Sequence, residues 1–428
     1  MISTISLMIL LMIPFGIIAS GNSEVTSQEQ QVLTIWDFKY TDPTTKRVFS
    51  KIDKEFMKLH PEVTIEHLGF NDEDFTYTMK SAMIAGTAPD IFMLHPGAEY
   101  IEFESYLSSL DDFLMETTID FLPGVLQTTT DDEGIVRALP FTIQGMGWYY
   151  NRELFEAAGL SPDDYPRSFD DFYHVCRELD DAGIIPIATG NNRPLTTDFI
   201  RRMLIPTYYS DKEIETFYRQ GQGFASPDFE KIMGFILKLR KEGWLDSEGI
   251  FMPYFNYAKD HFAAGKSAMI PGLLSDIANW KEFSDTLGTD SVGYFANLQN
   301  PDMSFPGIQL LQSAGLVWAV NQDSLSPEKK DIVYEYLRTL YSEQTQKLLI
   351  SQLGLLMPLE NQKLPIDEYP VLSQITESLD YRGHDLEGFT PTISIRNEFY
   401  RYDKLLINTC EIPLEVYIQR LYNYSSLF

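Results

Sequence analysis

Basic residues are scarce in this sequence. It has 33 Lys and Arg against 62 Asp and Glu, so the formal net charge is -29. Such an excess of negative charge repels nucleic-acid phosphates and anionic membrane surfaces at long range. We therefore expect no nucleic-acid partner, whereas a neutral or cationic small ligand remains open.

Cysteine and metal-site motifs are nearly absent as well. There is no CxxC, and the six histidines lack the close pairing of metalloproteases. No P-loop, GxSxG or GxGxxG occurs, so the sequence gives little reason to expect a phosphate-transfer enzyme or an enzyme with a nucleophilic side chain. We expect no metal, no cofactor and no catalysis. A disulfide between Cys176 and Cys410 stays open, because sequence cannot give their separation, and buried free thiols are slightly favoured.

A long hydrophobic run occurs only at the start, from Ile5 to Ile18, and the small residues Ala19, Ser20 and Gly21 follow it. This pattern is typical of a secretory signal peptide over residues 1–21, although no Lys or Arg precedes the run. An uncleaved anchor is the alternative. No cysteine near its end could carry a lipid, so we expect an exported protein, periplasmic or extracellular.

The 428 residues suffice for two domains. Strand-like segments at 32–36, 63–68 and 91–94 alternate with helical periodicity, and this order indicates a parallel sheet covered by helices. In "AMIAGTAPDIFML", a helix is expected to end at Gly86 and a buried strand to begin after Asp90. There the Asp90 carboxylate can accept backbone N–H bonds, which favours a structural role.

A second α/β block follows Pro140. Ser168 begins a capping-box pattern, and residues 184–188 are predicted to form a strand. Further helices are expected over 198–219, 228–243 and 254–264, another strand over 310–320, and a long helix beginning at Ser326-Pro327. No internal repeat or low-complexity linker appears. Two lobes joined by short crossings fit this pattern.

Paired acids such as Asp111-Asp112 and Asp180-Asp181 raise the alternative of a secreted carbohydrate hydrolase. A glycosidase needs two carboxyl groups separated across a cleft, with the pKa of one of them raised. Adjacent residues diverge in direction instead, so solvated turns and helix ends explain these pairs better.

Binding of a neutral polyol requires aromatic faces together with amide, carboxylate or guanidinium groups. The predicted strand ends and loops supply such residues, although a plain surface-loop role is the simpler interpretation for any one of them. They are Phe38, Tyr40, Asn71, His95, Gln144, Asn191, Asn192 and Arg193.

Several fragments in this order resemble one known family. They are "LTIWDF", "FMKLHPEVTIE", "AMIAGTAPDIFML", "SSLDDF", "GIVRALPFTIQGMGWYYNRELFEAAGL", "SFDDFYHVCRELDDAGIIPIA", "FAAGKSAMIPG" and "GLVWAVNQDSLSPEKKDIVYEYL". The sequence resembles the extracellular solute-binding proteins of sugar ABC importers, the group that includes maltose-binding protein. The resemblance covers nearly all of residues 32–360.

The resemblance implies a periplasmic-binding-protein-like α/β fold, in which two lobes with a hinge at Pro140 to Thr142 enclose an interlobe ligand cleft. It implies one lobe from 31–141 with 306–355 and another from 142–305 with 356–428. With the strand-end residues it gives a candidate ligand site. That site comprises Phe38, Asn71, Leu94, His95, Gly97, Gln144, Asn192, Arg193, Leu274 and Ser275.

Within "AMIPGLLSD", the residues after Gly272 are Leu273, Leu274 and Ser275, where the family often has an aromatic side chain. This departure argues against a maltodextrin-like ligand. We expect a monomer that captures a sugar or sugar-like molecule by lobe closure and delivers it to ABC permease subunits. A hydrolase, or a binding protein dedicated to chemosensing, is the alternative.

Overall fold

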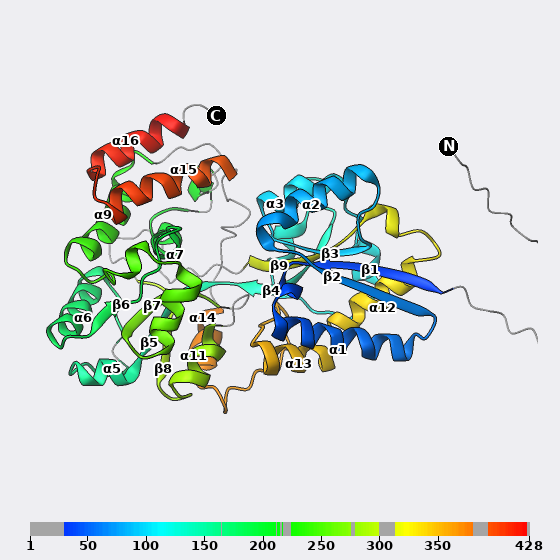
Figure 1. Ribbon diagram of the computed structural model, residues 1–428, viewed down its shortest axis with the longest axis horizontal. Coiled ribbons are helices and arrows are strands. Elements are labelled where there is room, and N and C mark those ends of the chain that lie inside the picture. Colours follow the sequence, from blue (N-terminus) through cyan, green and yellow to red (C-terminus); the bar gives the residue numbers. More distant parts are fainter. Residues whose placement is uncertain are drawn as a thin grey trace, which may run out of the picture.

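The computed structural model describes residues 30–425, apart from 164, 211, 215, 217–223, 275–278, 299–312 and 380–392. The expected signal peptide and Ser275 lie outside the described residues. Two α/β lobes stand side by side, each with its own β-sheet and hydrophobic core (Figure 1). We call the lobe that contains the first strands the N-lobe and the other the C-lobe.

The N-lobe sheet has the strand order β2-β1-β3-β9-β4. Its strands are β1 (Gln31–Asp37), β2 (Val63–Gly69), β3 (Ile91–Leu94), β4 (Ala138–Gln144) and β9 (Ser313–Val320). The first three pair in parallel, which confirms the sequence prediction. However, β9 enters from far along the chain and pairs antiparallel with both β3 and β4. The sheet is therefore mixed.

Helices with local capping signals cover this sheet. In α1 (Pro43–Leu59), the Asp42 side chain accepts the Thr45 N–H, and Val48, Phe49, Ile52 and Phe56 are buried. Helix α2 (Asp72–Ala85) ends at Gly86, whose φ of 68° is left-handed, as predicted. The remaining N-lobe helices are α3 (Ala98–Phe103), α4 (Asp111–Met115), α12 (Lys330–Leu340) and α13 (Glu343–Leu353).

Asp90 has the structural role predicted from sequence. One of its carboxylate oxygens accepts the Thr34 N–H at 2.8 Å, and Lys329 Nζ lies 2.8 and 2.9 Å from the two oxygens. Burial alone would raise the pKa of Asp90, but the Lys329 ammonium and the Thr34 N–H outweigh it and lower that pKa. Asp90 thus ties β1, β3 and the start of α12 together.

The C-lobe sheet has the order β6-β7-β5-β8. Its strands are β5 (Met146–Asn151), β6 (Ile185–Ile187), β7 (Ser267–Leu273) and β8 (Val292–Phe295). The described helices around it include α5 (Arg152–Ala157), α6 (Phe169–Asp181), α7 (Leu195–Leu204), α9 (Pro227–Lys241), α10 (Lys259–Ala263), α11 (Asn279–Leu287), α14 (Val371–Leu379), α15 (Ile393–Asp403) and α16 (Leu414–Ser425). The predicted capping box at Ser168 is confirmed.

Two helix predictions were wrong in their bounds. The helix expected over 198–219 ends at Leu204 and passes into a 3-10 turn, Ile205–Thr207, because Pro206 cannot continue the α-helical bonding. The helix expected to begin at Ser326-Pro327 begins at Lys330, after a turn in which Ser326 O accepts the Lys329 N–H. That delay places Lys329 against Asp90.

Cys176 is buried and Cys410 is exposed, and both thiols are free. The preference for free thiols is thus confirmed, whereas the expected burial of Cys410 is wrong. In the part of the chain that the structure describes, no helix is both long and apolar enough to span a bilayer.

Candidate functional site

One residue separates the two sheets at their shortest connection. Strand β4 ends at Gln144, β5 begins at Met146, and only Gly145 lies between them. The Gly145 carbonyl also accepts the Leu274 N–H at 2.9 Å, directly after β7. The N-lobe edge that carries Gln144 therefore faces the C-lobe edge that carries Met146 and Leu274, and β4 points at the C-lobe in Figure 1.

The strand directions place other chain segments at these same edges. In the N-lobe, β3 and β4 both pair antiparallel with β9, so the ends of β1, β3 and β4 share one edge. In the C-lobe, β6 runs parallel to β7 and therefore ends at the edge of Leu273. Ligands of open α/β sheets bind beyond such strand ends. We call these two facing edges the interlobe site.

An aromatic cluster forms the N-lobe part of the interlobe site. Phe38, just after β1, stacks on His95, just after β3, with ring centroids 4.6 Å apart and an interplanar angle of 24°. Phe75 of α2 meets Phe38 edge-on. Phe38 is buried and His95 half-buried, so His95 is the member of the stack that is more open to a ligand.

Gly97 and Asn71 lie at helix starts near this cluster. Gly97 precedes α3 with φ 81°, a backbone conformation that favours glycine. Asn71 precedes α2, and its exposed side chain makes no capping hydrogen bond. Its amide therefore remains open to solvent or to a ligand.

Leu94 and Leu274 are both 0% exposed. Leu94 packs in the N-lobe core and Leu274 in the C-lobe core. In the described conformation neither side chain is open to a ligand, so any contact of these two positions with a ligand would be through the backbone.

Gln144 and Thr142 present unused hydrogen-bond acceptors on β4. Gln144 is 6% exposed and Thr142 is 0% exposed, and neither Gln144 Oε1 nor Thr142 Oγ1 has a hydrogen-bond partner. Both atoms lie over Gly315 of β9, where an added Cβ would stand 2.7 Å from Thr142 Oγ1 and 3.0 Å from Gln144 Oε1. A strand glycine often marks the close approach of another group, and buried acceptors without partners are uncommon.

The loop after β6 forms part of the C-lobe edge. Asn192 and Arg193 are exposed, and the Arg193 guanidinium lies over the Tyr400 ring at 5.4 Å. The neighbouring Asn191 amide is buried and donates to Thr197 Oγ1 and Asn408 Oδ1 at 2.8 Å each. Asn191 thus holds the loop, whereas Asn192 and Arg193 face outward.

A buried polar chain supports the aromatic cluster from behind. Burial raises the pKa of Asp37 to about 6, against the opposing influence of His67. His67 lies 3.8 Å from Asp37 Oδ2 and 3.0 Å from Asp53 Oδ2, and Tyr336 donates to Asp53 at 2.6 Å. The Lys39 N–H donates to the other Asp37 oxygen at 2.6 Å. Asp37 therefore fixes the turn that carries Phe38.

Two polar residues of this region were not identified as site candidates from the sequence. Thr142 lies two positions before Gln144, and the period of two along a strand could have indicated it. Asn279, at the start of α11, is 0% exposed, and neither of its amide atoms has a hydrogen-bond partner. Its side chain lies against Gly272 of β7, only seven residues earlier, but that approach depends on how the chain folds between β7 and α11, so no sequence pattern signalled it.

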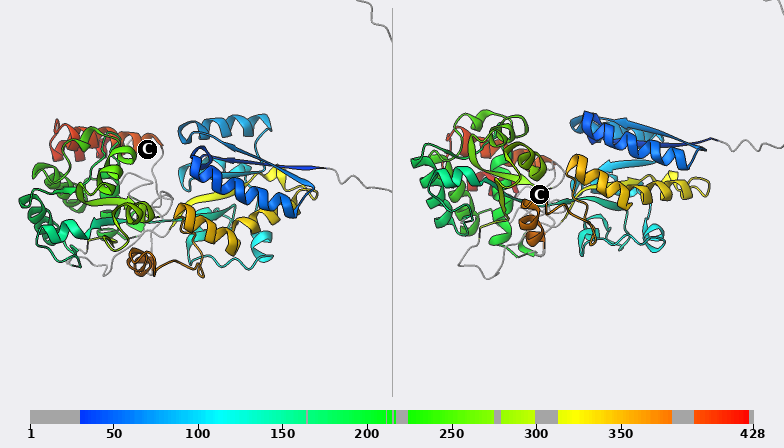
Figure 2. Two further views of the ribbon diagram at one scale, coloured as in Figure 1. Left: turned by 60° about the horizontal axis from the view of Figure 1, so that its bottom comes forward. Right: turned by 90° about the horizontal axis from the view of Figure 1, so that it is seen from below.

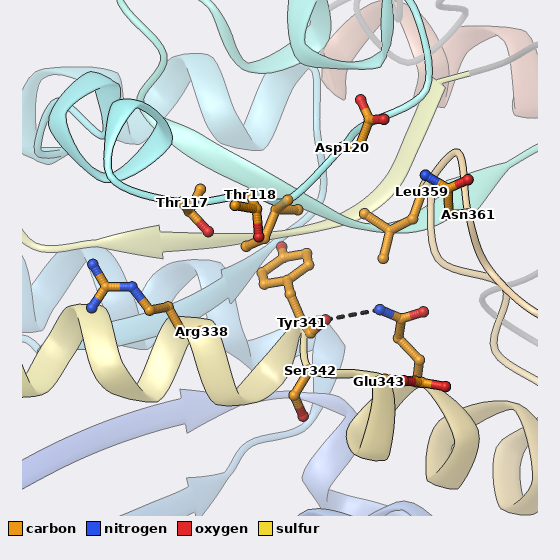
Figure 3. A pocket seen from close by; sticks show the side chains of 11 residues that line it. Thr117, Thr118, Asp120, Arg338, Tyr341, Ser342, Glu343, Leu359 and Asn361 are labelled. Atoms are coloured by element: carbon orange, nitrogen blue, oxygen red, sulfur yellow. Dashed lines mark hydrogen bonds between the residues drawn. The ribbon is translucent and has the colours of Figure 1, made fainter.

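A polar pocket of about 370 Å³ lies elsewhere, against the segment that leads from α13 to the C-lobe (Figure 3). Its floor includes Tyr341 and Leu359, and the side chains of Arg338 and Asp120 lie on different sides of it. None of the predicted ligand residues lines it. Among the described residues, no group of three or more His, Cys, Asp or Glu could hold a metal ion.

Comparison with known proteins gives a family match. Residues 42–347 match the sequence profile of the bacterial extracellular solute-binding protein family. The melibiose/raffinose/stachyose-binding protein MelE of Bacillus subtilis is 30% identical over 172 residues, which cover 40% of this chain and 38% of that protein. An uncharacterized ABC transporter extracellular-binding protein of Pyrococcus horikoshii is 24% identical over 254 residues, 55% of this chain and 56% of that protein. The matched segments thus span roughly half or less of these curated relatives.

Solved structures share the fold over nearly the whole chain. A chitin oligosaccharide binding protein gives a TM-score of 0.77 at 19% identity and covers 93% of this chain and 98% of its own. A Bacillus licheniformis sugar transporter protein, solved with stachyose, gives 0.71 at 15% identity, with coverages of 92% and 99%. These likenesses show the two-lobed fold.

Proposed function

The chain belongs to the bacterial extracellular solute-binding protein family, and we propose that it captures a sugar or sugar-like molecule in the interlobe site for delivery to the permease subunits of an ABC importer. The observation that carries this proposal is the unpartnered Gln144 Oε1, held at the junction of the two lobes. A sugar hydroxyl is a suitable donor to it. The His95 ring, just after β3 at the same edge of the sheet, offers a face for the C–H surface of a sugar.

The mechanism is lobe closure around the solute. A ligand that touches both lobes stabilises the closed arrangement through its higher affinity for that arrangement. Phe38, Asn71, His95 and Gly97 act from the N-lobe. Asn192, Arg193 and the segment containing Leu274 and Ser275 act from the C-lobe, and Gln144 stands between them. A mismatched sugar leaves buried polar groups unpaired, which gives specificity.

Several finer features belong to the same proposal. The protein is exported and acts as a monomer, with lobe bounds near 31–141 with 306–355 and 142–305 with 356–428, the last residues of β4 forming the crossing between the lobes. It binds its ligand without converting it, because the interlobe site contains no pair of carboxyl groups among the residues proposed for it. Relatives named as binding proteins of ABC transporters support this view.

The test is a thermal-shift screen followed by calorimetry. Melibiose, raffinose, stachyose and chitin oligosaccharides are the first candidates, because proteins similar to this one are named for binding them or related sugars. At 100 times the dissociation constant, a ligand that binds only the folded state adds about 2.7 kcal/mol to the unfolding free energy. Stoichiometric binding of an unchanged sugar supports the proposal. Turnover of chromogenic glycosides, or absence of saccharide binding across a broad library, would overturn it.

A further inference from the structure

Helix α1 carries a concentration of positive charge that is unusual for this chain. Its residues include five Lys and Arg against two Asp and Glu, so its formal charge is +3 within a protein of net charge -29. One of the two acids, Asp53, is buried and interacts with His67 and Tyr336. The fully exposed charged side chains of α1 are therefore all cationic.

Four of these cations lie on one side of the helix. Arg47, Lys51, Lys54 and Lys58 follow each other at intervals of four, three and four residues, which is the spacing of a single helix face. All four are exposed, while the opposite face packs into the N-lobe core through Val48, Phe49, Ile52 and Phe56. We call these four residues the cationic face. Helix α1 lies along the outer side of the N-lobe, beside α12 and α13 (Figures 1 and 2).

Three of the four cations of the cationic face are not neutralised by the protein's own acids. Some lysines elsewhere on the surface pair with carboxylates, as in the Lys80–Glu102 and Lys330–Asp112 pairs. Lys58 pairs with Glu55 at 2.5 Å. Within the described part of the chain, Arg47, Lys51 and Lys54 take part in no ion pair. Three adjacent cations without an acidic partner, in a chain with almost twice as many acids as bases, form an open cationic surface.

The chemistry of this surface fits a lipid bilayer better than a protein. It forms a shallow groove of about 590 Å³ lined by Arg47, Ser50, Lys51, Lys54, Glu55, Met57 and Lys58, without an aromatic side chain. Protein interfaces are enriched in aromatic residues and depleted in lysine. By contrast, a stripe of Lys and Arg that runs about 17 Å along the helix, from Arg47 to Lys58, suits a flat array of anionic headgroups.

We propose that the cationic face of α1 docks weakly on an anionic bilayer surface. The negative charge of the rest of the molecule is repelled by the same surface, so attraction at α1 and repulsion elsewhere orient the protein with the N-lobe toward the membrane. Because the Debye length is about 8 Å at physiological ionic strength, the cations nearest the bilayer dominate and the docking is salt-sensitive. This docking is independent of which solute the interlobe site binds.

The experiment measures partitioning of the full chain onto vesicles of phosphatidylcholine alone and of an equimolar mixture with phosphatidylglycerol. Binding through the apolar N-terminal segment is common to both, so the difference reports the charge contribution. We expect stronger binding to the anionic vesicles, lost in high sodium chloride. Neutralising the face with Arg47→Gln, Lys51→Gln, Lys54→Gln and Lys58→Gln should reduce the anionic preference by about tenfold or more.

The matched control removes the same number of charges from exposed lysines of the C-lobe. Lys231→Gln, Lys238→Gln, Lys241→Gln and Lys266→Gln give the same net charge as the α1 variant but should leave the anionic preference unchanged. Melting temperatures verify that both variants are folded. The salt dependence of vesicle binding by the unmodified chain measures the charge contribution without any substitution. Equal losses in the two variants, or no preference of the unmodified chain for phosphatidylglycerol, would overturn the proposal. Calorimetry with sugars tests the proposed function separately.

Discussion

The Gln144 side chain reaches over Gly315 of the neighbouring strand β9, where an added Cβ would stand 3.0 Å from Gln144 Oε1, although Gln144 itself pairs with Ser313. The pairing register shifts on both sides of Thr142, so Thr142 pairs with Leu316 and Ile143 with Ala314. Gly315 is thereby left opposite the bulge, and the Gln144 and Thr142 side chains fold over it. This local irregularity, at the last strand before the lobe crossing, keeps two acceptors buried and unpaired.

Replacing Gln144 with alanine should weaken sugar binding about tenfold while the melting temperature stays nearly constant. The affinity falls because a ligand hydroxyl loses its acceptor, which is worth about 0.5–1.5 kcal/mol or more when the hydroxyl stays buried. Stability is preserved because Gln144 Oε1 accepts no hydrogen bond within the protein. Calorimetry and thermal unfolding measure the two quantities.

Gln374 provides the matched control, because its Oε1 accepts the Tyr294 N–H at 2.9 Å. Gln374→Ala should lower the melting temperature and leave the dissociation constant unchanged. An unaltered dissociation constant in Gln144→Ala would remove Gln144 from the site.

Gly315→Ala should destabilise the N-lobe by about 1–3 kcal/mol, because the new methyl group overlaps the Thr142 hydroxyl at 2.7 Å. It should also weaken binding by displacing Gln144. Combining it with Thr142→Ala removes the closest overlap, so the double variant should recover much of the lost stability. Denaturant unfolding of the two single variants and the double variant gives the coupling energy. Strict additivity would contradict the packing described for this strand pair.

Stability should respond to pH through Asp90. The pKa of Asp90 is lower in the folded protein than its ordinary value, so its contribution is present above the unfolded pKa, near 4, and disappears as pH falls through the folded value. At neutral pH, Asp90→Asn should reduce the unfolding free energy by about 1–3 kcal/mol, because Lys329 loses its anionic partner. The difference between this variant and the unmodified protein should shrink below pH 4. A pH-independent difference would exclude the ionic contribution, and sugar affinity serves as the control because it should not change.

Asp37 should act in the opposite sense. Burial raises the pKa of Asp37 to about 6, so its protonated form is favoured in the folded state. The resulting stability is complete below the unfolded pKa, near 4, and is lost as pH rises through about 6. The Asp37→Asn variant carries no titrating group there. Its unfolding free energy should therefore rise relative to the unmodified protein by up to about 3 kcal/mol between pH 4 and pH 7.

Parallel unfolding curves over that pH range test this directly. A constant difference between Asp37→Asn and the unmodified protein would show that Asp37 does not titrate in this window. Because Asp37 holds the turn that carries Phe38, sugar affinity measured on the same samples reports whether the turn itself moves.

Local sequence patterns were sufficient to predict those helices and strands whose signals lie within a few residues of one another. Gly86 ends α2, the Ser168 capping box begins α6, and the apolar run 91–94 forms β3, because each depends on neighbours within a few residues. The role of Asp90 also followed from its place between a helix and a buried strand. Its strongest partner, Lys329, lies 239 positions away and could not be read from the sequence.

The sequence by itself determined the family, the alternation of helices and strands, the acidic surface and the strand-end segments from which a ligand site could be built. Only the tertiary structure decided that β9 inserts antiparallel between β3 and β4, that Leu94 and Leu274 turn into the cores, and that Gln144 and Thr142 lie unpaired over Gly315. The reason is physical: capping and periodicity are local, whereas strand register, burial and the pairing of polar atoms depend on groups that meet only when the chain has folded.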